Sequence, residues 1–285
     1  QFLRAKSDIQ QFQPDLLVVV DFPGFNLRMA QWAKNQGIKV VYFIPPKVWA
    51  WKQSRLKKLA AYTDQILSIL PFEEEWYAAK GQEAFYIGNP LAERYEGKDA
   101  FVEDAKRIVL LPGSRVQEVS RLLPVFFELA KALPDQEFHI VRAPSVAEHW
   151  PSNPMPTNLH VHDKPLVEVA DRASFALTCS GTAALEIALL GIPQAVVYKA
   201  NPISLAIARM FVKLKYFSLP NLILDRSAVP ELLQGEVQID RLKALIQEGG
   251  DGQRHDYALL RTMLGSQKLV ESAVPRIMDL LAEKK

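Results

Sequence analysis

Hydrophobic and polar positions divide the chain into short apolar runs and longer amphipathic stretches that alternate along the sequence. The apolar runs, three to six residues long, predict buried β-strands at 16–20, 39–44, 65–70, 84–87, 107–111, 137–141, 159–161, 175–178 and 194–198. Segments with helical spacing follow most of these runs, among them a basic helix that is expected to end at about Ala61. Three more close the sequence at 239–247, 253–264 and 268–283. Alternation of helices with fully apolar strands predicts an α/β fold whose parallel sheets are covered on both faces.

A polar segment interrupts this alternation. Residues 88–105 contain Pro90 and Gly97 and show no sustained period, so we expect a linker between two domains there. The expected domains are a Rossmann-like domain over residues 1–95 and a second one over 96–265. A C-terminal helix over 266–285 could pack back on the first domain. The length of 285 residues is comfortable for two domains.

Composition excludes several classes of protein. Apolar residues make up 49% of the chain and charged residues 23%, which allows a large core and argues against disorder. The single cysteine, Cys179, excludes a disulfide framework and fits a reducing compartment. The sequence has no run of eighteen apolar residues, so it predicts no membrane-spanning helix.

The net charge of +2 conceals two segments that lack acidic residues. Residues 22–63 carry eight basic residues and no acidic one, and residues 187–224 carry four basic residues and no acidic one. Large apolar side chains accompany the basic ones, a pairing that suits an anionic lipid surface at least as well as nucleic acid. Ordinary solvated helix faces remain an alternative. The expected lipid-facing residues are Trp49, Trp51, Ile203, Ile207, Arg209, Met210, Phe211 and Lys213.

Two strand-to-helix junctions resemble phosphate-binding loops. Residues 112–115 (Pro-Gly-Ser-Arg) follow the strand at 107–111, and residues 180–182 (Ser-Gly-Thr) follow the strand at 175–178. A helix that starts at such a loop presents free N–H groups and its positive dipole end, and Arg115 can hold a phosphate bidentately. A well-capped helix explains either loop alone, but two loops at carboxyl ends of strands favour a ligand site. Neither loop has the P-loop or dinucleotide-binding pattern.

Two carboxylates extend this candidate site. Glu186, one turn into the helix that follows the second loop, could accept hydrogen bonds from both hydroxyls of a ribose. Asp21 ends the strand at 16–20 and could serve as a base from the other domain, although a turn-forming role explains it equally well. These features suggest a nucleotide-sugar enzyme whose active site lies between two domains. The five histidines show no metal-ligand spacing.

In order and spacing, six segments resemble the lipid-A-disaccharide synthase family, glycosyltransferase family 19. They are 21–26 (DFPGFN), 48–51 (VWAW), 70–73 (LPFE), 110–118 (LLPGSRVQE), 180–186 (SGTAALE) and 218–221 (SLPN). The resemblance implies a GT-B fold, with two Rossmann-like domains whose parallel sheets face each other across a cleft. It also implies an inverting transfer of 2,3-diacylglucosamine from UDP to 2,3-diacylglucosamine 1-phosphate. The products would be UDP and a β-1,6-linked disaccharide 1-phosphate, with no metal or other cofactor required.

The resemblance assigns roles to the candidate residues. Asp21 would be the base that deprotonates the acceptor hydroxyl, and Arg115 would stabilise the leaving UDP together with the helix start at 180–182. The expected nucleotide-binding residues are Gly113, Ser114, Arg115, Ser180, Gly181, Thr182, Glu186 and Asn221. The family's place is peripheral, on the cytoplasmic face of the inner membrane of a Gram-negative bacterium. Anionic lipid and the two lipid substrates are the expected partners, nucleic acid is not, and a homodimer stays open.

The sequence departs from the family pattern at two levels. The family's first βα unit, with its Gly-Glu-x-Ser-Gly-Asp loop, is expected upstream of Gln1, so we expect the first domain to be incomplete. Asn89 and Lys47 stand where the family usually has His and Ser, and neither is given a catalytic role. Two other functions remain open: a UDP-sugar 2-epimerase, which shares the GT-B fold but needs no lipid-facing surface, and a non-catalytic UDP-binding fragment.

Overall fold

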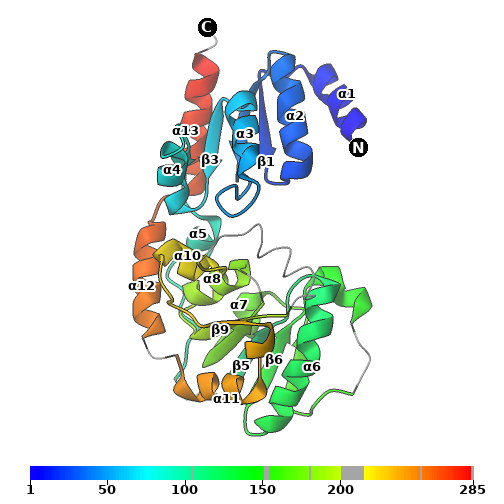
Figure 1. Ribbon diagram of the computed structural model, residues 1–285, viewed down its shortest axis with the longest axis vertical. Helices are drawn as coiled ribbons and strands as arrows, with labels where there is room; N and C mark the ends of the chain where they lie inside the picture. Colours follow the sequence, from blue (N-terminus) through cyan, green and yellow to red (C-terminus); the bar gives the residue numbers. More distant parts are fainter. Residues whose placement is uncertain (104–105, 151–153, 180, 200–214, 251, 284–285) are drawn as a thin grey trace. The chain divides into compact units, whose positions relative to one another are not determined.

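The computed structural model describes residues 1–103, 106–150, 154–179, 181–199, 215–250 and 252–283, and it divides into two compact units (Figure 1). Unit 1 holds Gln1–Glu93 and the chain from Leu264 on, and unit 2 holds the described residues from 94 to 263. The strands described in each unit form one parallel sheet. The expected α/β class with two parallel-sheet domains is therefore confirmed.

Among the described residues, unit 1 has a four-stranded sheet in the order β1-β2-β3-β4. Its strands are β1 (Leu16–Val20), β2 (Lys39–Phe43), β3 (Gln65–Ser68) and β4 (Phe85–Tyr86). Its helices are α1 (Phe2–Phe12), α2 (Pro23–Asn35), η1 (Gln53–Arg55, a 3₁₀ turn), α3 (Leu56–Tyr62), α4 (Pro71–Ala78), α5 (Pro90–Arg94, whose last residue belongs to unit 2) and α13 (Leu269–Ala282).

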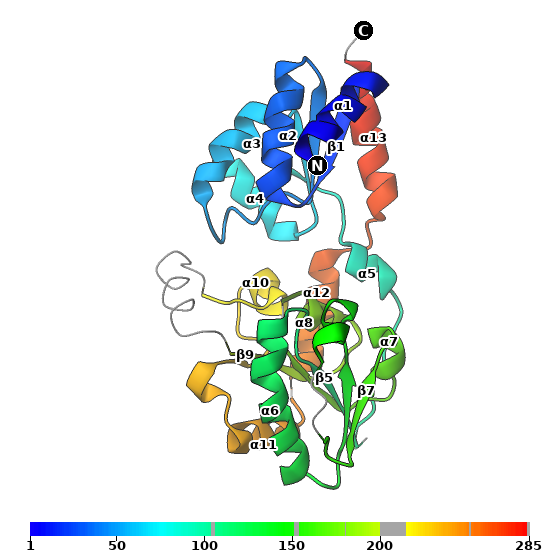
Figure 2. The same ribbon diagram turned by 90° about the vertical axis from the view of Figure 1, so that its right-hand side faces the viewer.

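Both faces of the unit 1 sheet are covered because its strands are apolar on both sides. On one face, Val40 and Tyr42 of β2 are fully buried in a cluster with side chains of α2 and α3. On the other face, Val41 packs in a second cluster that includes Ala273 of α13. The Lys39 ammonium group also donates a 2.6 Å hydrogen bond to the backbone oxygen of Leu280, near the end of α13. Figure 2 shows α13 and α2 on opposite sides of β1.

Unit 2 has a six-stranded parallel sheet, counted over the described residues, in the order β10-β9-β8-β5-β6-β7. Its strands are β5 (Arg107–Leu111), β6 (Glu137–Val141), β7 (Leu159–His162), β8 (Phe175–Thr178), β9 (Gln194–Tyr198) and β10 (Glu231–Leu233). Its helices are α6 (Val116–Ala132), η2 (Pro144–His149, 3₁₀), α7 (Leu166–Val169), α8 (Gly181–Leu189), α10 (Leu219–Leu224), η3 (Gln234–Glu236, 3₁₀), α11 (Ile239–Glu248) and α12 (Gln253–Leu264).

The strand order of unit 2 creates a topological switch point between β5 and β8. After β5 the chain builds outward through β6 and β7, and it then returns to the other side of β5 to place β8, β9 and β10. In open α/β sheets, ligands bind outside the carboxyl ends of the strands at such a point. The large core of the unit includes residues of this sheet and of α6, and Phe126, Phe138 and Phe175 are almost fully buried in it. A ligand site is therefore expected at the residues that follow β5 and β8.

Three local features differ from the sequence-based expectation. Strand β10 was not predicted, because it is three residues long and follows Pro230. The expected linker contains the short helix α5, which is capped by buried Asn89: its Oδ1 accepts a 2.9 Å hydrogen bond from the Leu91 N–H. Its Nδ2 donates to the Ile69 oxygen, so Asn89 has a structural role. The basic helix expected before residue 61 is short, because α3 begins only at Leu56.

Candidate functional site

The two phosphate-type loops leave neighbouring strands of unit 2. Leu111 of β5 pairs with Thr178 of β8, and the Cys179 N–H donates a 2.9 Å hydrogen bond to the Leu111 oxygen. Helix α6 starts at Val116 after the first loop, and α8 starts at Gly181 within the second. The loops and both helix starts therefore lie at the switch point. Thr182 is exposed there, and Ser180 lies outside the described residues.

Glu118 organises the first loop, a role that the sequence analysis did not assign. Its buried carboxylate accepts hydrogen bonds through Oε2 from the N–H groups of Ser114 (3.1 Å) and Arg115 (3.3 Å). A Cβ added to Gly113, whose φ is +107°, would lie 2.4 Å from that same oxygen. Only glycine therefore fits at this position. The available sequence signal was a glutamate at the third helical position, where capping carboxylates are common.

Arg115 is anchored at the edge of the site but remains largely exposed. Its guanidinium donates a 2.7 Å hydrogen bond to Glu118 Oε1, while 78% of the side chain is accessible. The hydrogen bond from Arg115 to the Glu118 carboxylate raises the pKa of the guanidinium, which stays cationic at any physiological pH. Because Glu118 takes the backbone N–H of Ser114, the loop offers an anion mainly the Arg115 guanidinium. The expectation that Gly113, Ser114 and Arg115 bind the nucleotide stays a prediction.

Cys179, which directly precedes the second loop, is an unreactive cysteine. The side chain is 3% exposed, and burial, followed by the charge of Glu118, raises the pKa of the thiol to about 12. A thiolate is the reactive form of cysteine. Cys179 is therefore protonated near neutral pH and is no candidate for a nucleophile.

Glu186 lies one turn into α8 and is held by a tyrosine from a distant part of the chain. Tyr95 is 2% exposed, and its hydroxyl donates a 3.2 Å hydrogen bond to Glu186 Oε1. Partial burial raises the pKa of Glu186, and the hydrogen bond from Tyr95 acts in the opposite direction. The tyrosine therefore orients the carboxylate and favours its charged form. Sequence reasoning identified Glu186 but had no means of finding its partner.

Asn221, an expected nucleotide-binding residue, has its amide engaged in hydrogen bonds within unit 2, and its role at the nucleotide stays a prediction. It is fully buried, and its Oδ1 accepts 2.8 Å hydrogen bonds from the N–H groups of Ala228 and Val229. Its Nδ2 donates 2.9 Å hydrogen bonds to the Val229 oxygen and to Glu231 Oε1. An asparagine amide has two donors and two acceptor sites, so these four bonds use its full capacity.

The carboxylate that Asn221 contacts holds the start of α10 beside α8. Glu231 Oε1 also accepts a 2.9 Å hydrogen bond from the N–H of Ser218, just before α10. On the other side, a Cβ added to Gly181 would lie 3.4 Å from the Leu219 side chain. The segment from 217 to 219 therefore forms a wall against the first turn of α8.

In unit 1, Asp21 is presented by a strained and firmly held backbone. Asp21 and Phe22 have φ values of +47° and +40°, a conformation that non-glycine residues rarely adopt. The Asp21 oxygen accepts hydrogen bonds from Asn26 Nδ2 (2.7 Å) and from the Tyr42 hydroxyl (2.8 Å). Consecutive strained residues persist only where their surroundings enforce them, often at functional sites. Here Asn26 and Tyr42 hold the turn, and Asp21 is exposed at the carboxyl end of β1.

The expected lipid-facing residues have different environments. The Trp49 indole donates a 2.8 Å hydrogen bond to buried Glu73, and its ring lies 5.0 Å from that of Phe72, so Trp49 secures its own loop. Trp51 is 52% exposed, with the Lys52 ammonium group 4.5 Å from its ring centre. The other expected residues lie outside the described part of the chain: Ile203, Ile207, Arg209, Met210, Phe211 and Lys213.

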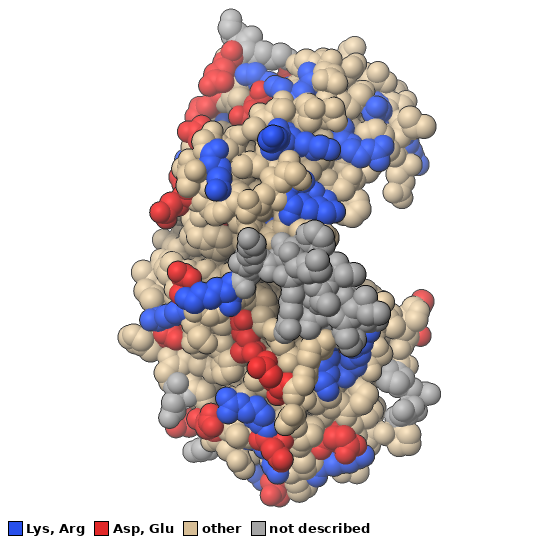
Figure 3. Space-filling view, viewed as in Figure 1, with Lys and Arg blue, Asp and Glu red and all other residues tan. Residues whose placement is uncertain are grey.

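Charge is unevenly distributed over unit 1. The face shown in Figure 3 carries lysine and arginine side chains over α2 and α3, and acidic side chains gather toward α4 and α13. Part of this positive charge is neutralised, since Lys34 forms a 2.6 Å ion pair with Asp64. Within the described residues, no helix has the length and apolarity needed to cross a membrane.

Sequence comparisons identify relatives along most of the chain. Residues 3–271 match the family model described as lipid-A-disaccharide synthetase. The lipid-A-disaccharide synthase of a Sulfurihydrogenibium species is 37% identical over 94% of this chain and 78% of its own length. The enzyme of the same name from Gluconobacter oxydans is 37% identical over 82% of this chain and 60% of its own length. The chain thus spans between three fifths and four fifths of these two relatives.

Solved structures share the fold at low sequence identity. The glycotransferase of kitacinnamycin has a TM-score of 0.62 and 17% identity, covering 99% of this chain and 79% of its own. A spinosyn rhamnosyltransferase complexed with thymidine diphosphate has a TM-score of 0.61 and 15% identity, covering 98% and 76%. The UDP-GlcNAc 2-epimerase of Methanocaldococcus jannaschii, in complex with UDP-GlcNAc and UDP, has a TM-score of 0.55 and 12% identity, covering 92% and 79%. At such identities the likeness concerns the fold alone.

Proposed function

Because the chain belongs to the lipid-A-disaccharide synthase family, a family of glycosyltransferases, we propose that it transfers 2,3-diacylglucosamine from UDP to 2,3-diacylglucosamine 1-phosphate. The acceptor hydroxyl attacks the anomeric carbon of the donor, the bond from that carbon to the diphosphate breaks, and the configuration inverts. A β-1,6-linked disaccharide 1-phosphate and UDP are the products. UDP carries the electron pair of the broken bond, and the proton of the hydroxyl goes to a base.

One observation in unit 2 supports this proposal most strongly: two phosphate-type loops leave the neighbouring strands β5 and β8 at the switch point of the sheet. Arg115 at the first loop gives a fixed positive charge, and the start of α8 at Gly181 adds the positive end of a helix dipole. Charge that develops on a leaving diphosphate would be stabilised by these groups without reorganisation. Glu186, held by Tyr95, would accept hydrogen bonds from the ribose hydroxyls.

In this proposal Asp21 is the base. Its exposed position at the end of β1 suits a group that must reach an acceptor hydroxyl, and its backbone is held by Asn26 and Tyr42. A positioned carboxylate that accepts a proton accelerates such a step by roughly 10²–10⁴-fold. We therefore expect Asp21 to be needed for the transfer step and not for UDP binding.

The lipid nature of both substrates leads to a proposal about location. The positive face over α2 and α3 and the exposed Trp51 would attract an anionic membrane surface, with peripheral attachment at the cytoplasmic face of the inner membrane. Basic residues near such a surface contribute about 1 kcal/mol each at low salt. Vesicles of phosphatidylglycerol and phosphatidylethanolamine should therefore sediment with the protein at low salt and release it at high salt.

The function is tested by supplying full-length protein with both lipid substrates and analysing the products by mass spectrometry. Disaccharide 1-phosphate and UDP should form in equal amounts, and only when acceptor is present. A UDP-sugar 2-epimerase is the alternative function, because the fold of this chain resembles that of the M. jannaschii enzyme. That activity would change the configuration of a UDP-sugar without any acceptor. A protein that only binds UDP would convert neither substrate.

A further inference from the structure

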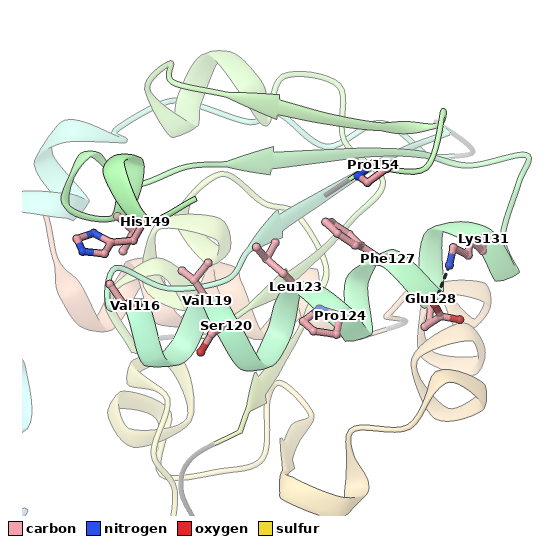
Figure 4. Close-up of a pocket in the computed structure, with 11 residues that line it drawn as sticks. Val116, Val119, Ser120, Leu123, Pro124, Phe127, Glu128, Lys131, His149 and Pro154 are labelled. Atoms are coloured by element: carbon pink, nitrogen blue, oxygen red, sulfur yellow. Dashed lines mark hydrogen bonds and ion pairs between the residues drawn. The ribbon is translucent and has the colours of Figure 1, made fainter. Parts of the chain in front are cut away.

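An apolar groove runs along α6 away from the Arg115 loop. It has a volume of about 410 Å³, is confined to unit 2, and lies between α6, η2 and Pro154. Figure 4 shows its lining side chains spread along α6 from Val116 at one end to Lys131 at the other, with His149 near the Val116 end. The volume falls within the range of roughly 300–1,000 Å³ that is usual for small-molecule sites.

The groove changes from charged to apolar and back along its length. Arg115, largely exposed, immediately precedes Val116 at one end, and an ion pair of 2.9 Å between Glu128 and Lys131 lies at the other. Between these ends the α6 side chains that line the groove are uncharged and, except for Ser120, apolar; they are Val116, Val119, Ser120, Leu123, Pro124 and Phe127. His149 of η2 adds a polar ring near the Val116 end. A ligand that follows the groove thus meets a cation first and hydrocarbon afterwards.

The apolar face of α6 is wider than packing on the sheet requires. Leu122 and Phe126 are fully buried in the core of unit 2 and satisfy that requirement. Val116 is 43% exposed, although a surface helix normally has polar residues on the side away from its core. Pro124 is also exposed and sits inside the helix, where proline removes a hydrogen bond and costs stability. Its ring lines the groove, so these departures from a stable helix surface coincide at one place.

We propose that this groove binds an acyl chain of the donor substrate, so that the UDP-diacylglucosamine is held by its diphosphate at Arg115 and by hydrocarbon along α6. This inference rests on the proposed function and extends it, since it places the binding site for the donor's acyl chain in unit 2. An amphiphile with an anionic head and a hydrocarbon tail matches the order of charge and apolar surface along the groove. Each methylene group removed from water there adds to affinity for the acylated donor and adds nothing to affinity for UDP.

The test compares the dissociation constants of UDP-2,3-diacylglucosamine and of UDP by calorimetry. Ser120→Trp fills the groove from an exposed position, so the core should remain intact, which the melting temperature checks. We expect the acylated donor to bind at least tenfold more weakly and UDP to bind within twofold of wild type. Gln117→Trp is the matched control, because Gln117 is exposed on the same helix and does not line the groove. It should leave the ratio of the two constants unchanged.

A second variant separates binding from stability. Pro124→Gln restores a helical N–H and places a polar group in the groove. It should therefore raise the melting temperature and weaken binding of the acylated donor severalfold. An unchanged ratio in both Ser120→Trp and Pro124→Gln would overturn the groove proposal, even if the wild type makes disaccharide. A wild-type protein that makes no disaccharide and binds UDP-diacylglucosamine no better than UDP would instead overturn the proposed function itself.

Discussion

The Glu118 carboxylate and the Arg115 guanidinium form a 2.7 Å ion pair at the start of α6, and the same carboxylate binds the Ser114 and Arg115 backbone N–H groups. Glu118 is 9% exposed in its side chain, whereas Arg115 is 78% exposed. A buried carboxylate thus fixes the loop from inside and leaves a cation presented to solvent. The pair divides two tasks, since one residue shapes the loop and the other is available to an anion.

Arg115→Ala should weaken UDP binding by about 1.5–3 kcal/mol, the range for a hydrogen bond to a charged group. The expected cause is loss of the cation that meets the diphosphate. Calorimetry measures the change, and Arg142→Ala is a suitable control because Arg142 pairs with Asp163 instead. Equal UDP affinity in wild type and Arg115→Ala would remove Arg115 from the nucleotide site.

Tyr95→Phe should weaken UDP binding near neutral pH by about 0.5–1.5 kcal/mol, the net value of one hydrogen bond. The hydroxyl of Tyr95 lowers the pKa of Glu186 against the effect of burial, so its removal leaves that pKa higher. The acid side of the pH profile for UDP binding should therefore move to higher pH. Phenylalanine preserves the packing of this buried ring, so the melting temperature serves as the control. Superimposable pH profiles would show that Glu186 does not contact the nucleotide.

Asp21→Asn in the full-length protein should abolish turnover and leave UDP binding intact. Asparagine has nearly the same shape and tolerates the left-handed backbone of this position, but it cannot accept the proton. Initial rates of disaccharide formation and UDP calorimetry measure the two properties separately. Near wild-type turnover with an unchanged melting temperature would assign the base to another residue.

Glu73→Gln should stabilise unit 1 above neutral pH. Burial raises the pKa of Glu73 to about 7, against hydrogen bonding from Trp49, so the folded state favours the protonated acid. The stability associated with that proton is complete below about pH 4.5 and is lost as the pH rises to about 7, a difference of about 3 kcal/mol. Glutamine keeps an oxygen acceptor for the Trp49 indole and carries no charge. Denaturant unfolding at pH 4.5 and pH 8 should show a gain only at the higher pH.

Much of the fold could be predicted from the sequence because parallel strands are apolar on both faces. The bounds of β5, β6, β8 and β9 agree with the expected runs, and α12 has the expected bounds as well. Strand β10 has only three residues and contains Glu231, so no apolar run marks it. The helix α5 begins at a proline that sequence reasoning treated as a break, although proline is well tolerated in a first helical turn.

The candidate site was predictable only in part. Local sequence placed Arg115 and the start of α8 at the ends of strands, and the sheet then brought them together. The partner of Glu186 is 91 residues away at Tyr95, and no pattern along the chain connects the two. Asn221 occurs in a recognisable motif, yet its hydrogen bonds to Val229 and Glu231 give it a scaffolding role. Motifs thus indicate where a candidate site lies, whereas the side-chain pairing around it is visible only in the structure.

Amide hydrogen exchange of the full-length protein with and without UDP tests most directly whether the nucleotide binds where β5 and β8 end. Addition of saturating UDP should slow exchange in peptides that cover residues 112–118 and 179–187, and peptides from β6 and β7 should change little. Residues 112–118 follow β5 and residues 179–187 follow β8, so protection in both would place the nucleotide at the switch point. Protection confined to other parts of unit 2, with neither of these segments affected, would contradict that location.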